Sequence, residues 1–310
     1  MAIIRKEAYF NSSTGKNKIR AMIWQDEKVS PVGVLQIAHG VSEHIERYDD
    51  FARVLAENGF VVCGNDHLGH GKSVNALGDL GYLAEKNGHF RMVDDMHILY
   101  KIMHKRFPDL PYFLFGHSMG SFCARVYSAV FGHTLAGAIY SGTGQFPVAA
   151  AAVKGPLDKL VKKFGADKSA GSFMDVLGRV QSLPFEDGKE DALAWLSRDK
   201  ENREEYRDDP LCGAPLKLGG IRDLIFIGLE ASRPNWASKL PLDLPVLLIS
   251  GAKDPVGGNG KGVLAVADAL EEVGIEPTVI LYPNDRHEIL QEDDKEKVYA
   301  DVLKWLKLYV

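Results

Sequence analysis

Short runs of apolar residues alternate with longer amphipathic segments along most of this 310-residue sequence. The apolar runs are nearly continuous, which is what strands need when both faces of a parallel sheet are covered. This alternation predicts an α/β fold with a mostly parallel, doubly wound sheet. An antiparallel hairpin is expected at one edge, from about residues 3–10 and 18–25. The expected strands are 32–39, 60–65, 112–115, 135–140, 246–250 and 278–282, and the expected helices are 49–58, 90–107, 118–131, 263–273 and 294–308.

The alternation breaks off between about residues 145 and 242. Helical, charged and Pro/Gly-interrupted segments fill this stretch, and it holds no convincing strand. Such an insertion predicts a cap over the carboxyl edge of the sheet, where ligands of open α/β sheets bind. We therefore expect a core made of residues 1–144 and 243–310, and a helical cap, or lid, made of residues 145–242.

Charge and cysteine content narrow the range of functions. The net charge is −5 without a Lys/Arg cluster, whereas nucleic-acid binding uses a basic surface, so we expect no nucleic-acid partner. Cys63, Cys123 and Cys212 are widely spaced, which is typical of free thiols in a reducing compartment. Because the first residues lack the apolar region of a signal peptide, we expect a cytoplasmic protein. Residues 126–153 carry no charged side chain, but Pro147 and four glycines interrupt them, which argues against a membrane span.

The sequence Gly-His-Ser-Met-Gly at residues 116–120 joins an expected strand directly to an expected helix. In that context a G-x-S-x-G pattern indicates a sharp turn that raises the serine hydroxyl above the sheet. The glycines let neighbouring backbone approach closely, and the free N–H groups of the helix favour a developing negative charge. We interpret Ser118 as a nucleophile, against the alternative of a plain strand-to-helix turn.

A serine nucleophile needs a base, and the imidazole of that base needs a carboxylate partner. His287 lies in a polar loop just after the last apolar strand, and Asp254 directly follows another strand. His117 adjoins the serine, but consecutive side chains at a turn point apart, which makes it a poor candidate base. The order Ser118, Asp254, His287, each at the carboxyl end of a strand, predicts a catalytic triad.

The loop Ile-Ala-His-Gly-Val-Ser-Glu-His at residues 37–44 follows another expected strand. We expect it to offer a backbone N–H near Gly40–Val41 to an oxyanion, opposite the N–H of Met119. The histidines of this region also suggest a metal cluster, but no acidic or cysteine ligand accompanies them at metal spacing. Hydrogen bonds that shape the loop are the favoured interpretation, and we expect neither metal nor cofactor. These histidines are His39, His44, His67 and His70.

With these residues in place, the chain resembles the α/β-hydrolase superfamily and, within it, the monoacylglycerol lipase/lysophospholipase-like serine hydrolases. The resemblance covers almost the whole chain. The Asp-His-x-Gly-His-Gly-x-Ser stretch is more specific than the serine motif. The segments that carry it are HGVSEHIERY (39–48), DHLGHGKS (66–73), GHSMG (116–120), SGAKDPVG (250–257) and RHEIL (286–290).

The resemblance implies an α/β-hydrolase fold and hydrolysis of carboxylic esters without a cofactor, typically of one acyl chain on glycerol. It also implies that the N–H groups of Val41 and Met119 form the oxyanion hole. Ser42 departs from the glycine usual at its position, which leaves the geometry of this loop open. In such proteins the cap shapes an acyl tunnel. Two interpretations of the apolar residues 146–153 stay open. They form either part of that tunnel or a lip in transient contact with a membrane surface, or else a buried cap helix.

Two other functions compete with a small-molecule esterase. Acidic residues in the cap could hold the ammonium group of an aminopeptidase substrate, although arginines interleave with them and a solvated helix face with i,i+4 pairs is simpler. A hydrolase-fold protein that only binds a ligand is the third hypothesis, because fold does not fix function. The acidic residues concerned are Glu201, Glu204, Glu205, Asp208 and Asp209, interleaved with Arg203 and Arg207.

Overall fold

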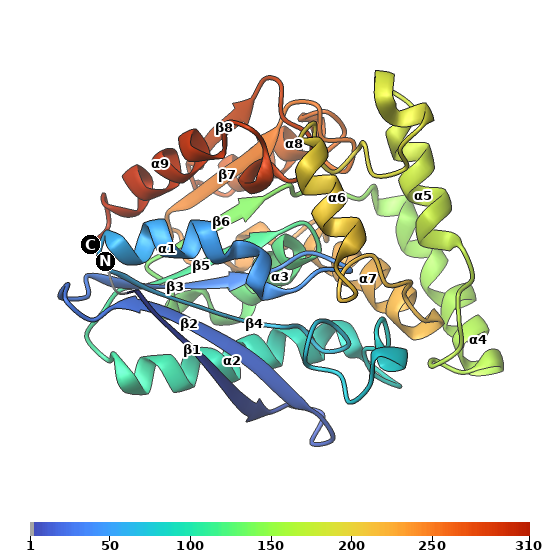
Figure 1. The fold of residues 1–310 in the computed structure, drawn as a ribbon, viewed down its shortest axis with the longest axis horizontal. Coiled ribbons are helices and arrows are strands. Elements are labelled where there is room, and N and C mark those ends of the chain that lie inside the picture. The colour runs from blue at the N-terminus through green and yellow to red at the C-terminus, as the bar shows by residue number, and fades with distance from the viewer. Residues whose placement is uncertain (1–2) are drawn as a thin grey trace.

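A computed structural model of the chain describes residues 3–310. It contains an eight-stranded sheet in the order β1-β2-β4-β3-β5-β6-β7-β8 (Figure 1). From β4 to β8 the neighbouring strands are parallel, while β1 and β2 add the expected antiparallel hairpin at one edge. The strands are β1 (Ile3–Asn11), β2 (Lys18–Asp26), β3 (Gly33–Ala38), β4 (Phe60–Asn65), β5 (Tyr112–His117), β6 (Gly137–Ser141), β7 (Val246–Gly251) and β8 (Thr278–Tyr282).

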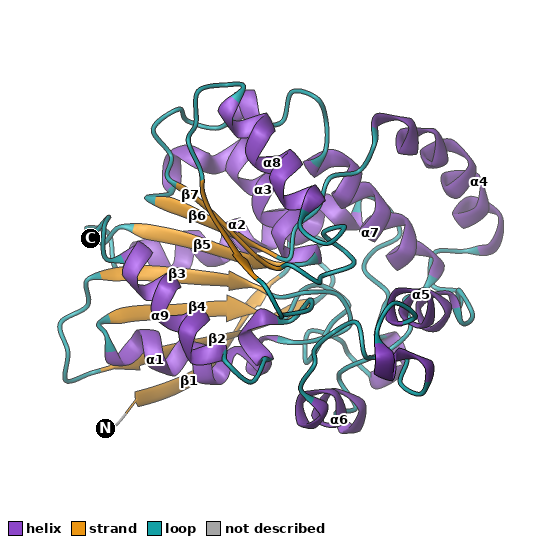
Figure 2. Ribbon diagram, turned by 90° about the horizontal axis from the view of Figure 1, so that it is seen from above, coloured by secondary structure: helices purple, strands orange, loops and turns teal. Residues whose placement is uncertain are grey.

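Helices cover both faces of the sheet, as Figure 2 shows from above. Helices α1 and α9 pack on one apolar face, and α2, α3 and α8 pack on the other. The strands between them are buried on both sides, which explains their nearly continuous apolar sequences. The core helices are α1 (Asp49–Glu57), α2 (Gly88–Arg106), α3 (Met119–Phe131), α8 (Lys261–Glu271) and α9 (Lys295–Leu306).

Four further helices lie between β6 and β7 in the chain, beyond the carboxyl ends of the parallel strands (Figures 1 and 2). They are α4 (Lys154–Phe164), α5 (Phe173–Ser182), α6 (Lys200–Asp208) and α7 (Leu218–Ala231). Helix α7 packs against α2, α3 and α4, and so joins the helical segment to the layer behind the sheet. Short 3-10 helices complete the fold at Ile45–Tyr48, Leu77–Asp79, Gly132–Thr134, Val148–Val153, Glu186–Lys189, Ala237–Lys239 and Ile289–Gln291.

Strand register brings the loops of interest to one edge. Ala38 pairs with Gly116 at the ends of β3 and β5, and His117 pairs with Ser141 at the ends of β5 and β6. Strand β5 therefore runs two residues past the apolar run that predicted it, because Gly116 and His117 still have backbone partners. The loops after β3, β5, β7 and β8 all leave the sheet at this carboxyl edge, where ligands of α/β sheets bind.

Candidate active site

Ser118 lies at a strained turn between β5 and α3. Its backbone has φ 52° and ψ −121°, a conformation that residues with a side chain rarely adopt. The turn is held by its N–H, which donates to the Ser141 carbonyl at 2.9 Å. A Cβ on Gly116 would lie 2.3 Å from the Gly120 carbonyl oxygen, and one on Gly120 would lie 2.1 Å from that of Ala38. Only glycine fits at these two positions, so the motif keeps Ser118 in this conformation.

Asp254 and His287 meet at the ends of β7 and β8. The Nδ1 atom of His287 lies 2.9 Å from Oδ2 of Asp254, and both side chains are buried. The Asp254 carboxylate also accepts hydrogen bonds from the Val256 N–H at 2.8 Å and the Ser250 hydroxyl at 3.3 Å. Burial alone would lower the pKa of His287, but the charge and hydrogen bonding of Asp254 raise it above its usual 6.5. The Asp254 carboxylate is therefore placed to stabilise the protonated, imidazolium form of His287.

His117 lines the same cavity as Ser118 and His287, so its ring faces the site. Its ring centroid lies 4.7 Å from that of His287, and its Nδ1 lies 3.4 Å from the Ser141 hydroxyl. There is room for both rings because Gly142 has no side chain, and a Cβ there would be 3.1 Å from each. Burial, together with the nearby His287, holds the pKa of His117 well below 6.5, so it packs there as a neutral ring.

The loop after β3 passes directly over the serine. A Cβ on Gly40 would lie 3.3 Å from Cβ of Ser118, and Val41 lines a cavity together with Ser118 and Met119. The loop is held internally, because the Gly40 N–H donates to Oε1 of Glu43 at 2.5 Å. Val41 and Met119, the first residue of α3, thus line one cavity with the candidate nucleophile.

Two cavities meet at Ser118. One, of about 410 Å³, is mostly apolar, with Met119, Phe122, Phe146, Leu177, Leu224 and Ile225 in its wall. The other, of about 200 Å³, lies on the side of His287 and includes polar groups from Glu43, Tyr206 and Glu288. A serine at such a junction can act on a molecule with one apolar and one polar arm.

A buried charge network beside the smaller cavity was not foreseen from the sequence. The Arg47 guanidinium bonds to both carboxylate oxygens of Glu288 at 2.6 and 2.9 Å, to Glu43 at 2.9 Å and to the Asn202 side-chain oxygen at 2.8 Å. Burial alone would raise the pKa of Glu288, but the ion pair with Arg47 lowers it to about 2. The network joins the loop after β3, the loop of His287 and helix α6. The sequence signal for this network is the presence of Glu43, Arg47 and Glu288 within the short motifs at 39–48 and 286–290.

The histidines near the start of the chain act on loop structure. The His39 Nε2 accepts from the backbone N–H of His67 at 2.8 Å, and its Nδ1 donates to the Gly40 carbonyl at 2.7 Å. Burial lowers the pKa of His67 to about 3 and that of His70 to about 4, so both are neutral. The contacts of His39 match the interpretation of hydrogen bonds that shape the loop, whereas both buried ring nitrogens of His67 have no hydrogen-bond partner among the described residues.

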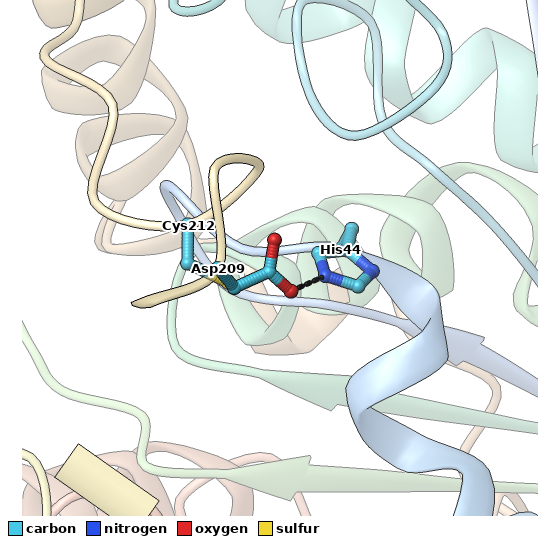
Figure 3. Close-up of side chains that lie close together, drawn as sticks. All are labelled: His44, Asp209 and Cys212. Carbon is cyan, nitrogen blue, oxygen red and sulfur yellow. Dashed lines mark hydrogen bonds and ion pairs between the residues drawn. The ribbon is translucent and has the colours of Figure 1, made fainter. Parts of the chain in front are cut away.

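A different group, His44, Asp209 and Cys212, has the donor atoms to hold a metal ion. One ligand atom of each lies within 4.8 Å of the others, and Nε2 of His44 is hydrogen-bonded to Oδ2 of Asp209 at 2.7 Å (Figure 3). Burial raises the pKa of the Cys212 thiol, which therefore stays protonated at neutral pH and is a poor metal ligand. The contact instead joins the loop after β3 to the segment after α6.

The acidic run on α6 does not reach the cavities. Glu201, Glu204, Glu205 and Asp208 are exposed, as the solvated-face interpretation expects. Asp209 departs from it, because it is half-buried and bonded to His44 at 2.7 Å. The expected i,i+4 pairs are wrong, however. Arg203 is buried against Asp187 at 2.7 Å, and Arg207 binds Asp191 at 3.0 Å, because both acids lie in the segment that precedes α6.

The apolar residues 146–153 divide into two parts. Phe146 and Pro147 line the larger cavity, whereas Val148–Val153 form a short 3-10 helix with Val148 and Val153 exposed. The alternative of a buried cap helix is therefore wrong. Among the described residues, no helix combines the length and the hydropathy that crossing a membrane requires.

Comparison with known proteins places the chain in a family. Residues 29–294 match the family described as serine aminopeptidase, S33. The chain is 30% identical over 294 residues to a monoacylglycerol lipase of Mycolicibacterium smegmatis, covering 92% of this chain and 91% of that protein. It is 26% identical over 292 residues to the human monoglyceride lipase, covering 89% and 83%. A thermostable carboxyl esterase from Bacillus coagulans superposes with a TM-score of 0.92 at 32% identity, over 99% of each chain.

The fold, the serine turn and these relatives agree with the resemblance that the sequence motifs predicted. An eight-stranded, mostly parallel sheet with helices on both faces is the α/β-hydrolase architecture. The chain belongs to the serine aminopeptidase S33 family of α/β-hydrolases and is a carboxylic ester hydrolase of the monoacylglycerol lipase type.

Proposed function

We propose that the protein hydrolyses esters of a single acyl chain with glycerol or a similar small alcohol, and that Ser118, His287 and Asp254 carry the reaction. The Ser118 Oγ attacks the ester carbonyl carbon, and its proton passes to Nε2 of His287. Asp254 holds the Nδ1–H of His287 and stabilises the imidazolium. The carbonyl oxygen becomes an oxyanion and accepts hydrogen bonds from the N–H groups of Val41 and Met119.

The second half of the reaction releases both products. The tetrahedral intermediate collapses, the C–O bond to the alcohol breaks, and the alcohol takes the proton from His287. Water then attacks the acyl-enzyme while His287 accepts its proton, and the fatty acid leaves as Ser118 regains a proton. Each step uses only groups of this chain and water.

The observation that carries the substrate class is the position of Ser118 where two cavities meet, the smaller of which has more polar groups in its wall. The apolar cavity of about 410 Å³ suits an acyl chain, and the smaller, more polar cavity suits the alcohol. The relatives support this assignment, since two are named as monoacylglycerol or monoglyceride lipases and the carboxyl esterase was solved in complex with glycerol.

We further propose that residues 145–242 act as a cap on a core of residues 1–144 and 243–310, and that the cap makes transient contact with lipid surfaces. Val176, Val180 and Leu183 on and after α5, like Val148 before α4, expose more than half of their side-chain surface. Helix α4 adds Lys159, Lys162 and Lys163 to this region, which favours anionic lipids, while its fourth lysine, Lys154, is paired with Glu230. Sedimentation with vesicles of phosphatidylglycerol and phosphatidylcholine tests this. Val176→Glu with Val180→Glu should abolish co-sedimentation, and unchanged binding would overturn the proposal.

The catalytic proposal is tested with Ser118→Ala. We expect loss of p-nitrophenyl ester hydrolysis and of labelling by a fluorophosphonate probe, with near-native folding by circular dichroism. Retained labelling would overturn the assignment of the nucleophile. A chain-length series of 1-acylglycerols then defines the acyl preference, and aminoacyl-anilides serve as the comparison substrate. Faster turnover of the anilides would replace the esterase by an aminopeptidase, and stoichiometric binding without turnover would indicate a ligand-binding protein.

A further inference from the structure

Ser42 is held in a left-handed backbone conformation directly after Val41. Its φ is 56°, a region that glycine enters freely and that costs a residue with a Cβ about 1–2 kcal/mol. Such strain persists only where the surroundings over-determine the conformation. The surroundings of Ser42 therefore reveal what fixes this loop.

Three hydrogen bonds fix Ser42, and all of them come from one segment. The Ser42 carbonyl accepts from the Gly213 N–H at 2.8 Å and from the Tyr206 hydroxyl at 3.0 Å. The Ser42 hydroxyl donates to the Ala214 carbonyl at 2.9 Å. The partners lie within residues 206–214, from the last turn of α6 to the loop after it, which we call the anchor segment.

The anchor segment is itself well held. Asp209 accepts from the Leu211 N–H at 2.8 Å with one oxygen and binds His44 with the other (Figure 3). The Cys212 N–H donates to the Asp209 carbonyl at 3.0 Å, which closes a tight turn. The segment thus presents a rigid surface to the loop after β3 at two points, residue 42 and residue 44.

The peptide that carries the Val41 N–H lies between two fixed points. On one side, the Gly40 N–H is bonded to Glu43 at 2.5 Å. On the other side, Ser42 is bonded to the anchor segment. The Gly40 carbonyl, which belongs to the same peptide, also accepts a hydrogen bond from Nδ1 of His39 at 2.7 Å. A change at Ser42 reaches this peptide through the two soft backbone dihedrals of Val41.

We propose that Ser42 is a positioning residue, through which the anchor segment 206–214 sets the direction of the Val41 N–H toward the oxyanion. The inference rests on the proposed function, because it assumes the role given to Val41. It assigns to the helical insertion a part in transition-state stabilisation, in addition to shaping the substrate cavity.

The test uses two substitutions at residue 42. Ser42→Ala keeps the backbone strain but loses the hydrogen bond to the Ala214 carbonyl. Ser42→Gly loses this hydrogen bond and also relieves the strain. We expect Ser42→Ala to lower kcat for p-nitrophenyl butyrate about tenfold while KM stays within about twofold, a smaller loss than the 10²–10³ that follows removal of an oxyanion donor. Ser42→Gly relieves the strain and keeps both hydrogen bonds to the carbonyl, so its expected loss of kcat is smaller than that of Ser42→Ala. Tyr206→Phe, which removes one bond to the Ser42 carbonyl, should lower kcat in the same direction.

A tetrahedral mimic separates positioning from a general loss of structure. An alkyl trifluoromethyl ketone forms an oxyanion on the nucleophilic serine, so its affinity should fall by the same factor as kcat/KM in each variant. Ser128→Ala is the matched control, since Ser128 is also buried and its hydroxyl also bonds to a backbone carbonyl, that of Ala124 at 2.9 Å. It should keep wild-type kcat.

Three outcomes overturn the inference: wild-type kcat in Ser42→Gly or Ser42→Ala, a kcat loss without weaker ketone binding, or an equal kcat loss in Ser128→Ala. If Ser42→Ala does not fold, Ser42→Gly and Tyr206→Phe carry the test. Ser118→Ala keeps the two proposals apart. Hydrolysis that survives in Ser118→Ala removes the proposed function, whereas an inactive Ser118→Ala beside a fully active Ser42→Ala removes only this inference.

Discussion

At the scale of single residues, the strained backbone of Ser118 lowers stability and places its side chain where two cavities meet. Its φ of 52° costs about 1–3 kcal/mol for a residue with a side chain. We predict that the free energy of unfolding of Ser118→Gly is about 1 kcal/mol higher than that of Ser118→Ala. This figure allows for the greater freedom of glycine in the unfolded chain. Both variants lack the hydroxyl, so urea denaturation compares the backbone alone. Equal stability of the two would show that the turn is not strained.

In the proposed mechanism His287 is the base, so the pH dependence of hydrolysis should report on its pKa. Its pKa is raised above 6.5, and the base must be neutral to accept a proton, so kcat/KM should rise with pH and reach half its maximum above pH 6.5. Besides Asp254, the charges of Glu288 and Glu43 raise this pKa. Glu288→Gln should therefore move the half-maximum to lower pH. Glu204→Gln, at an exposed position on α6, should leave it in place, and an unmoved profile in Glu288→Gln would contradict the electrostatic role.

At the scale of elements, the close packing of α3 on β3 depends on Gly120. A Cβ there would lie 2.1 Å from the Ala38 carbonyl, which is backbone and cannot move aside cheaply. We predict that Gly120→Ala destabilises the protein by roughly 3 kcal/mol. Gly155, also helical, has open space around its Cβ position, so Gly155→Ala should be neutral or stabilising by up to about 1 kcal/mol. Thermal unfolding of both variants checks the contrast.

Most elements of the core were predictable because each satisfies a local rule. The expected strands at 60–65 and 278–282 match β4 and β8 residue for residue, since both are apolar runs bounded by turn residues. The meeting of Asp254 and His287 was predictable for a related reason, because parallel strands deliver their carboxyl ends to one edge.

The rest depends on contacts between segments far apart in the chain. The partners of Arg203 and Arg207 are Asp187 and Asp191 rather than neighbours on α6, and no periodicity encodes such a choice. The contacts of Ser42 with the anchor segment span more than 160 positions. The unusual residue at position 42 marked the loop as special without revealing what holds it.

At the scale of the whole molecule, a buried acid makes stability depend on pH. Burial and the nearby Asp294 and Glu292 raise the pKa of Asp285 to about 7. The folded protein therefore holds this proton more tightly than the unfolded chain, in which an aspartate titrates near pH 3.9. The stability that this bound proton contributes is fully present below about pH 4 and is lost as the pH rises to about 7.

Asp285→Asn removes that loss, because an amide cannot ionise. We predict a melting temperature above that of the wild type, with a gain that grows between pH 4 and pH 7 and then levels off. Asp293→Asn, at a largely exposed neighbour, should give no such pH-dependent gain. Scanning fluorimetry at pH 4.5, 6 and 8 measures all three proteins, and a gain that does not vary with pH would contradict the raised pKa.

The left-handed Ser42 has a consequence for protein engineering. Exchange of whole lids between related hydrolases is an obvious route to new acyl preferences, and 145 and 242 look like natural splice points. A graft at those points would discard Tyr206, Gly213 and Ala214 and leave a strained serine without the groups that hold it. A chimera that exchanges only the outer helices α4 and α5 retains those groups, so recombination is better directed to the boundary between α5 and α6.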